Sequence, residues 1–150
     1  MDLQLNNKTA LVTGASTGIG KSIAFALAKE GVQLAISARR VDLLNEVAND
    51  IVKAGGKRPV VIESDLYPED ASVNLAHAAI KGLGQVDILI NNAGILRDKS
   101  FAKMELDDFR LVMDVHLMGA VHCCKAVWPI MNTQKYGRIV MTTSSSGLYG

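Results

Sequence analysis

The sequence predicts an α/β fold in which helices cover both faces of a parallel β-sheet. Three observations predict it. Short apolar runs alternate along the chain with stretches of helical periodicity. The connections between them are short and rich in turn-forming residues. The apolar runs are continuous instead of alternating with polar residues, as expected for strands that are buried on both faces.

Five apolar runs are predicted as strands. They cover residues 9–13, 32–37, 59–62, 86–90 and 138–142. The third run begins with Pro59, at a position where a strand tolerates a missing N–H group. No repeat or linker interrupts this order, so we expect residues 1–150 to form one domain.

Four helices are predicted between these strands, each from an apolar stripe. The first stripe consists of Ile19, Ile23 and Leu27. The second consists of Leu44, Val47, Ala48 and Ile51, and the pair Gly55-Gly56 ends that helix. The third consists of Ala76, Ala79, Ile80 and Leu83. The fourth helix is long, covers about residues 106–131, and carries on one face Phe109, Met113, His116, Leu117, Ala120 and Cys124.

The composition bounds the class of protein. The 150 residues are 49% hydrophobic and 21% charged, which excludes a disordered chain. The net charge of +1 argues against bulk binding to nucleic acid or to anionic lipid. No uncharged apolar run reaches the roughly 18 residues of a membrane helix. The two cysteines are adjacent, and the N-terminal residues lack a secretory signal, so we expect a cytoplasmic protein.

A glycine-rich loop joins the first strand to the first helix, with the spacing Gly-x-x-x-Gly-x-Gly. Glycines allow a sharp turn and a close approach to a ligand, and a helix start offers free N–H groups to a pyrophosphate. The loop predicts a dinucleotide site in a Rossmann-type, doubly wound sheet with strand order 3-2-1-4-5. An ordinary strand-to-helix turn is the alternative. The candidate binding residues are Thr13, Gly14, Ser16, Thr17, Gly18, Ile19 and Gly20.

The end of the second strand indicates which dinucleotide binds. An acidic residue there would hold the ribose hydroxyls of NAD. This chain has Arg39 and Arg40 instead, and a guanidinium suits the 2′-phosphate of NADP. Asp42 is better interpreted as a residue of the following helix start. We therefore expect NADP(H), with NAD(H) as the alternative cofactor and a solvated loop as the alternative role of the two arginines.

Several motifs in this order resemble the short-chain dehydrogenase/reductase family over the whole chain. Besides the glycine loop, Asp65-Leu66 resembles the family's adenine-contacting pair, and Asn91-Asn92-Ala93-Gly94 matches its signature after the fourth strand. The segments 137–140 and 143–147 match the strand that delivers the catalytic serine. The resemblance implies that Asp65, Leu66, Asn91, Ala93 and Gly94 contact the cofactor. It also implies that Ser144, which lies three residues before Gly147, stabilises developing charge on the substrate oxygen.

One departure from the family pattern points to a substrate class. The family usually has asparagine where this chain has His116, in the sequence His116-Leu117-Met118-Gly119. A histidine here, together with Leu148-Tyr149-Gly150, resembles the branch that acts on 3-oxoacyl or 3-hydroxyacyl thioesters in fatty acid metabolism. That branch includes the dehydrogenase part of multifunctional β-oxidation enzymes. His116 is therefore a candidate catalytic residue, and the alternative is a hydrogen-bonded core histidine. His77 and His122 are interpreted as structural, and no metal-ligand spacing is present.

The family's proton donor is a tyrosine in the helix after the serine strand, with a lysine one helical turn later. Counted from Ser144, both positions lie beyond Gly150, so the resemblance implies a domain that is incomplete at its C-terminus. It also implies a homodimer or homotetramer in the full-length form. Two functions remain open: an NADP(H)-dependent oxidoreductase, or a catalytically incomplete nucleotide-binding or interaction module. Neither predicts a nucleic-acid or membrane partner.

Overall fold

The computed structural model describes residues 1–68 and 70–149 and contains a five-stranded parallel sheet. The strand order is β3-β2-β1-β4-β5, which confirms the predicted order. The strands are β1 (Thr9–Thr13), β2 (Gln33–Ala38), β3 (Val60–Glu63), β4 (Ile88–Asn91) and β5 (Arg138–Met141). β1 lies in the centre, where Leu11 pairs with Ala35 of β2 and with Leu89 of β4. Each observed strand lies within one or two residues of its predicted bounds.

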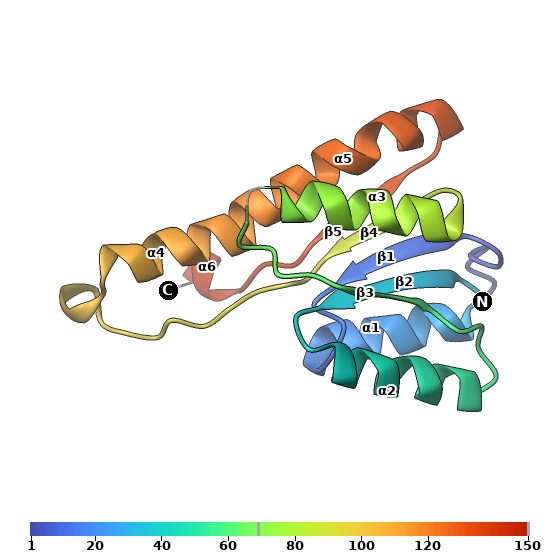
Figure 1. The fold of residues 1–150 in the computed structure, drawn as a ribbon, viewed down its shortest axis with the longest axis horizontal. Helices are drawn as coiled ribbons and strands as arrows, with labels where there is room; N and C mark the ends of the chain where they lie inside the picture. Colours follow the sequence, from blue (N-terminus) through green and yellow to red (C-terminus); the bar gives the residue numbers. More distant parts are fainter. Residues whose placement is uncertain (69, 150) are drawn as a thin grey trace.

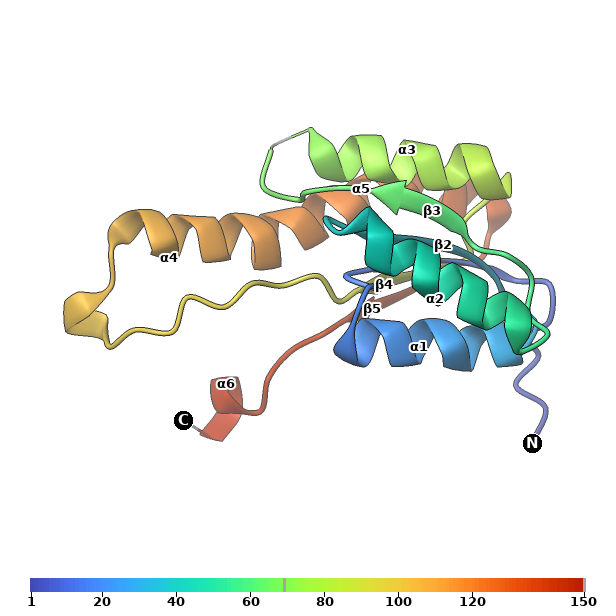
Figure 2. The ribbon, with the colours of Figure 1, turned by 60° about the horizontal axis from the view of Figure 1, so that its bottom comes forward.

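Two layers of helices enclose the sheet (Figures 1 and 2). One face is covered by α1 (Gly18–Lys29) and α2 (Val41–Lys53), and the other by α3 (Ala71–Leu83) and α5 (Gly119–Gln134). Alternate residues of β1 enter the two cores: Ala10 and Val12 pack toward α1 and α2, and Leu11 packs toward α3 and α5. Both faces of the sheet are therefore buried, as the continuous apolar runs predict.

The predicted long helix is present but is not a uniform α-helix. It consists of α4 (Leu106–Met113), a π-helical turn at Asp114–Met118, and α5. By length and composition alone, the run Leu106–Gln134 could cross a membrane, because its most apolar window carries few charges. Its α5 part packs into the core through Cys123, Val127 and Met131. α4 extends beyond the sheet with the loop that precedes it, which includes a 3-10 turn at Phe101–Lys103 (Figure 1).

One residue of a predicted stripe is misplaced. Ile19 does not lie on the buried face of α1, since 66% of its side chain is exposed. Gly20 and Ala24 are the buried residues of α1, and Ile23 and Leu27 pack beside them against the core. The reason is that Gly20 of α1 lies directly against the chain after β1. Ile19, the residue before it, therefore faces away from the core.

The C-terminal end of the described chain is exposed. β5 is an edge strand, and α6 (Ser146–Tyr149) follows it away from the sheet (Figure 2). Val140 and Met141 of β5 are about half exposed, and Leu148 and Tyr149 of α6 are almost fully exposed. Gly150, which belongs to one of the sequence motifs, lies outside the described residues.

Candidate functional site

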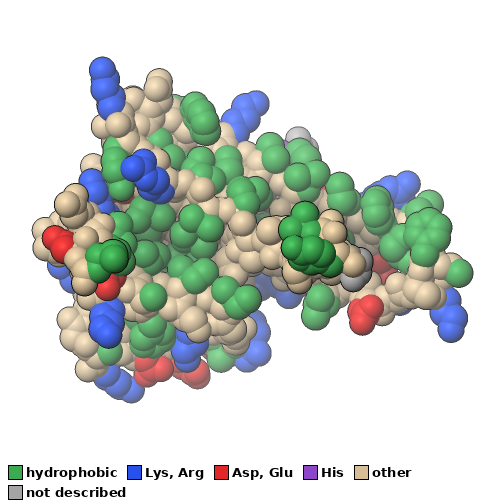
Figure 3. All heavy atoms as spheres, turned by 180° about the vertical axis from the view of Figure 1, so that it is seen from behind, with side chains coloured by type: hydrophobic (Ala, Val, Ile, Leu, Met, Phe, Trp, Pro, Cys, Tyr) green, Lys and Arg blue, Asp and Glu red, His purple; other side chains and the backbone are tan. Residues whose placement is uncertain are grey.

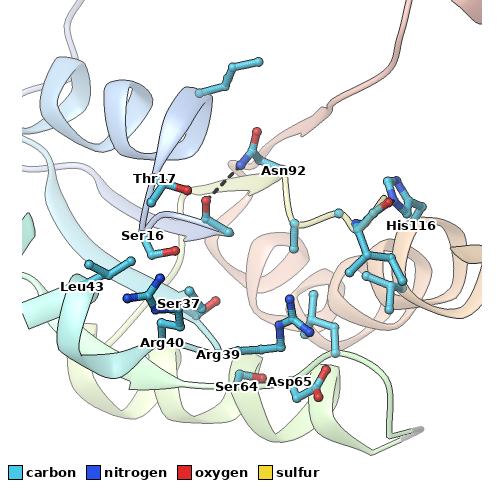
Figure 4. Close-up of a pocket in the computed structure, with 18 of the residues that line it drawn as sticks. Ser16, Thr17, Ser37, Arg39, Arg40, Leu43, Ser64, Asp65, Asn92 and His116 are labelled. Atoms are coloured by element: carbon cyan, nitrogen blue, oxygen red, sulfur yellow. Dashed lines mark hydrogen bonds between the residues drawn. The ribbon is translucent and has the colours of Figure 1, made fainter. Parts of the chain in front are cut away.

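The predicted site residues gather at the carboxyl edge of the sheet, where the loops after β1, β2, β3 and β4 meet. A cleft of about 660 Å³ opens there. Of the candidate residues, the cleft is lined by Gly14, Ser16, Thr17, Ile19, Arg39, Arg40, Asp65, Leu66, Ala93, Gly94 and His116. Figure 4 shows this cleft between the start of α1 and the helix that carries His116. Its position agrees with the general rule for ligands of open α/β sheets.

The glycine loop has the shape that a phosphate group needs. Gly14 and Gly18 have φ values of +66° and +57°, which residues with a Cβ rarely adopt. A Cβ on Gly14 would also come within 2.8 Å of Ala93 Cα. Gly20 is buried and lies directly beneath the Gly14 carbonyl, where a Cβ has no room. These glycines therefore let α1 and the loop after β4 approach the end of β1.

The start of α1 has the features of an anion-binding site. Thr17 precedes the helix and makes no capping side-chain bond with any residue of the described ranges. The first turn carries no acidic side chain. The first N–H groups and the positive end of the helix dipole therefore face the cleft without a local partner. The residues fit the pyrophosphate of a dinucleotide.

Thr13 ties the glycine loop to the loop after β4. Its hydroxyl accepts hydrogen bonds from the N–H groups of Asn92 and Ala93, both at 3.0 Å, and lies 3.3 Å from the carbonyl oxygen of Ile90. The side-chain amide of Asn92 donates to the carbonyls of Thr13 and Gly14, both at 3.2 Å. Figure 4 marks a bond from Asn92 to this loop. Thr13 thus supports the cleft from beneath without lining it.

The two arginines have different surroundings. Arg40 donates to the Asp42 carboxylate at 3.3 Å and, by this bond, lowers the pKa of Asp42. The Arg39 guanidinium has no ion pair within residues 1–68 and 70–149. In Figure 4 Arg39 extends toward Asp65, while Arg40 stays beside Ser37 and Leu43. Both side chains are exposed at the mouth of the cleft, where a phosphate could reach them.

A second, smaller cavity of about 220 Å³ adjoins the first and contains Ser144. Its lining includes Thr13, Asn91 and Met141 from the sheet and residues 142–144 after β5. Five residues line both cavities: Leu66, Asn92, Ala93, Val115 and His116. The Ser144 hydroxyl lies 2.8 Å from the Ser146 hydroxyl and accepts a bond from the Ser146 N–H group at 3.3 Å. The structure therefore brings Ser144 next to the dinucleotide cleft.

Asn91 supports the site from within the sheet. It is buried at the end of β4, and its side-chain amide faces the sulfur atoms of Cys124 at 3.4 Å and Met141 at 3.2 Å. Cys123 is also buried, and burial raises the pKa of its thiol to about 11. Neither cysteine lines the two cavities.

His116 lies in the π-helical turn, on the wall between the two cavities. Its Nε2 atom lies 2.9 Å from both the backbone nitrogen and the backbone oxygen of Ile95. The side chain is exposed, so it is not the buried core histidine that the sequence left open. His77 and His122 lie elsewhere on α3 and α5.

Some residues that line the cleft were not predicted from the sequence. Ser37 and Ser64 lie at or next to strand ends, which spacing could have indicated, and Leu43 lies in the first turn of α2. Ile95 and Val115 contribute through backbone position and apolar surface, for which the sequence offers no motif. Asn92 is part of the Asn-Asn-Ala-Gly motif, and its bonds to the glycine loop appear only in the structure.

Comparison with known proteins agrees with this geometry. A family model described as short chain dehydrogenase matches residues 8–150. The Drosophila melanogaster protein named peroxisomal multifunctional enzyme type 2 is 41% identical over 99% of this chain and 26% of that protein. The 3-oxoacyl-[acyl-carrier-protein] reductase of Synechocystis is 37% identical over 97% of this chain and 59% of that protein.

A solved structure is similar as well. The short-chain type dehydrogenase/reductase from Mycobacterium marinum superposes with a TM-score of 0.89 at 37% identity, covering 96% of this chain and 58% of that chain. The chain thus spans about a quarter of the fly protein and under two thirds of the other two.

Proposed function

Because this chain belongs to the short-chain dehydrogenase family, we propose that it holds the dinucleotide site and the catalytic serine of an oxidoreductase. The reaction is hydride transfer between NADP(H) and a carbonyl or alcohol substrate. The observation that carries this proposal is the pair of adjoining cavities, one over the uncapped start of α1 and the other holding Ser144.

In the proposed mechanism, the protein orients two reactants across the wall that the cavities share. A nicotinamide dinucleotide would supply or accept the hydride when bound. The N–H groups at the start of α1 would hold its pyrophosphate, and the segment after β4 would line the cleft that holds it. The Ser144 hydroxyl turns from Ser146 to donate a hydrogen bond to the substrate oxygen, where negative charge develops.

The proton comes, in this proposal, from the tyrosine and lysine that the family carries after the serine strand. The described tyrosines do not suit that role. Tyr136 lies at the opposite, amino edge of the sheet, between Lys8 and Arg138. Tyr67 follows β3, and Tyr149 lies in α6, too close after Ser144 to match the family's spacing.

We propose NADP(H) as the preferred cofactor and NAD(H) as the alternative. Arg39 supports this choice, since its guanidinium is exposed in the cleft and has no carboxylate partner in the described ranges. A guanidinium binds phosphate oxygens through two parallel hydrogen bonds. Arg40 offers a second contact once it leaves Asp42.

We propose a 3-oxoacyl or 3-hydroxyacyl thioester as the substrate, which would place the protein in fatty acid metabolism. One relative supports this class by name, namely the Synechocystis 3-oxoacyl-[acyl-carrier-protein] reductase. The homo-oligomeric state, the cytoplasmic location and the absence of nucleic-acid and membrane partners stay predictions. Several relatives carry peroxisomal names, so fractionation of cells that express a tagged protein is needed to determine the location.

The test is turnover by the purified protein with NADPH and an acetoacetyl thioester, followed by the loss of NADPH absorbance. We expect Ser144→Ala to lower kcat by about 100-fold or more, as for the loss of one donor to a developing oxyanion. Ser145→Ala is the matched control, because the neighbouring hydroxyl does not line the serine cavity. Equal turnover of the two variants would contradict the role of Ser144. Dinucleotide binding without turnover would favour the nucleotide-binding module.

A further inference from the structure

In the contact between His116 and Ile95, one ring nitrogen faces two backbone groups of opposite hydrogen-bonding type. One ring nitrogen, Nε2, lies at the same distance of 2.9 Å from a backbone donor and a backbone acceptor of the same residue. The ring reaches this position because it packs closely against Gly94, where a Cβ would come within 2.6 Å of the ring carbon Cε1. Gly94 therefore gives the imidazole access to the backbone of the next residue.

The contact between His116 and Ile95 fixes one end of the segment 92–95. The other end is already hydrogen-bonded to the glycine loop. Thr13 and Asn92 attach the segment to the glycine loop, and His116 attaches it to the π-helical turn at Asp114–Met118. Within this segment, Asn92 and Ala93 line both cavities, and Gly94 and Ile95 line the dinucleotide cleft alone. The position of Ile95 thus affects the shape of the dinucleotide cleft beside the shared wall.

A single imidazole nitrogen cannot bond both backbone groups at once. To accept from the Ile95 N–H group, Nε2 needs a free lone pair, which requires a neutral ring with its proton on Nδ1. A protonated ring carries N–H at Nε2 as well. Two donors, the Nε2–H group and the Ile95 N–H group, then face each other and cannot form a hydrogen bond. The Nε2–H group donates to the Ile95 carbonyl oxygen instead. The atom that holds the segment therefore changes with the protonation state of the ring.

We propose that His116 is a positioning residue whose neutral, Nδ1-protonated ring fixes Ile95 for dinucleotide binding, and that protonation of the ring releases the Ile95 N–H group and weakens that binding. The side chain acts on the wall of the cleft through the backbone and does not need to touch the substrate. This inference rests on the proposed dinucleotide site, and its test includes a measurement that does not depend on that site.

Other titratable groups face the same space and must be separated from His116. Arg39, Arg40 and Asp65 line the cleft from the loops after β2 and β3. Arg97, two residues after Ile95, contacts Asp108 of α4 at 3.1 Å. Asp114 lies in the same π-helical turn as His116. A His116→Asn variant separates them, because an amide accepts from the N–H group and donates to the carbonyl at every pH, while these groups remain.

The first measurement is the Kd of NADH and NADPH by calorimetry between about pH 8 and pH 5.5, where histidine titrates. NADH is needed because it has no 2′-phosphate that titrates in the same range. For the natural protein we expect binding of both dinucleotides to weaken about three- to tenfold on acidification, as for one lost hydrogen bond. His116→Asn should abolish this pH dependence and keep tight binding, and His116→Leu should bind weakly at every pH.

His122→Asn is the matched control, since His122 lies on α5 outside both cavities, and it should behave like the natural protein. The second measurement is the 15N chemical shift of the His116 ring without any ligand. At about pH 8 we expect Nε2 to be unprotonated and Nδ1 to carry the proton. The reverse tautomer, or the same pH dependence of NADH binding in His116→Asn, would overturn the inference. Absence of dinucleotide binding in every protein would refute the proposed function instead, and the ring shift would still decide the contact.

Discussion

Arg39 and Arg40 are neighbours in the sequence, and the structure gives them unequal freedom. Arg40 is bonded to Asp42, whereas Arg39 reaches along the cleft (Figure 4). A surface ion pair such as Arg40–Asp42 is screened by water and is easily exchanged for a ligand contact. We therefore expect Arg39 to make the first contact with the 2′-phosphate of the proposed cofactor.

We predict that Arg39→Asp lowers the affinity for NADPH by about tenfold or more, since a hydrogen bond to a charged group is lost and a like charge is added. The affinity for NADH should change little. Calorimetric Kd values for both dinucleotides check this prediction. Equal losses for NADPH and NADH would mean that Arg39 supports the loop and does not read the phosphate.

The adjacent cysteines Cys123 and Cys124 also differ in their exposure to solvent. Burial raises the pKa of the Cys123 thiol to about 11, so this thiol stays protonated at neutral pH and forms its reactive thiolate only as the pH rises toward that value. Cys124 is partly accessible. We predict that iodoacetamide at about pH 8 modifies Cys124 much faster than Cys123 in the native protein. Mass spectrometry of digested protein measures the ratio, and urea should remove the difference. Equal native rates would contradict the packing of α5.

At the scale of elements, one hydroxyl joins two strand ends. Thr13 at the end of β1 serves two N–H groups that follow β4. We predict that Thr13→Val, which keeps the shape and removes the oxygen, lowers the free energy of unfolding by about 1–3 kcal/mol. It should also weaken NADPH binding. Urea denaturation checks the stability, and Thr142→Val, at an exposed position after β5, is the control. A Thr13→Val protein as stable as the control would show that water replaces the hydroxyl.

The order of elements could be predicted from the sequence because strands buried on both faces leave continuous apolar runs, and helices leave periodic stripes. The glycine loop could be found from its position between a strand and a helix, whereas residues 91–94 and Ser144 were indicated by the resemblance to the family's motifs. Ile19 was assigned to the core because periodicity alone does not reveal a close helix-to-sheet approach at Gly20. The partner of His116 could not be predicted, since it depends on a π-helical turn within a uniform-looking pattern.

At the scale of the whole molecule, the distribution of exposed apolar side chains is the feature that bears most on association. Figure 3 shows hydrophobic side chains gathered on the face that holds β5 and along the protruding helix. On that helix the exposed residues repeat at helical spacing: Leu106, Phe109, Met113, Leu117 and Val121. Such a stripe is larger than scattered surface residues require and is typical of an association surface.

We predict that Leu117→Gln weakens self-association at least about tenfold, because each copy would bury a polar group in place of a leucine. Sedimentation velocity across a concentration series measures this change. The control is Val52→Gln on α2, where the side chain is similarly exposed, 44% against 47% for Leu117. A protein that remains monomeric at every concentration would contradict the predicted oligomer.

The π-helical turn has a consequence for how this chain tolerates insertions and deletions. A π turn holds one residue more than regular α-helix of the same rise. Deleting a residue there would restore regular geometry and keep α4 and α5 in phase, because the turn would lose only its extra residue. The wider turn that places the imidazole beside Ile95 would be lost, and the imidazole would leave Ile95. Chain length at Asp114–Met118 therefore constrains the site independently of residue identity.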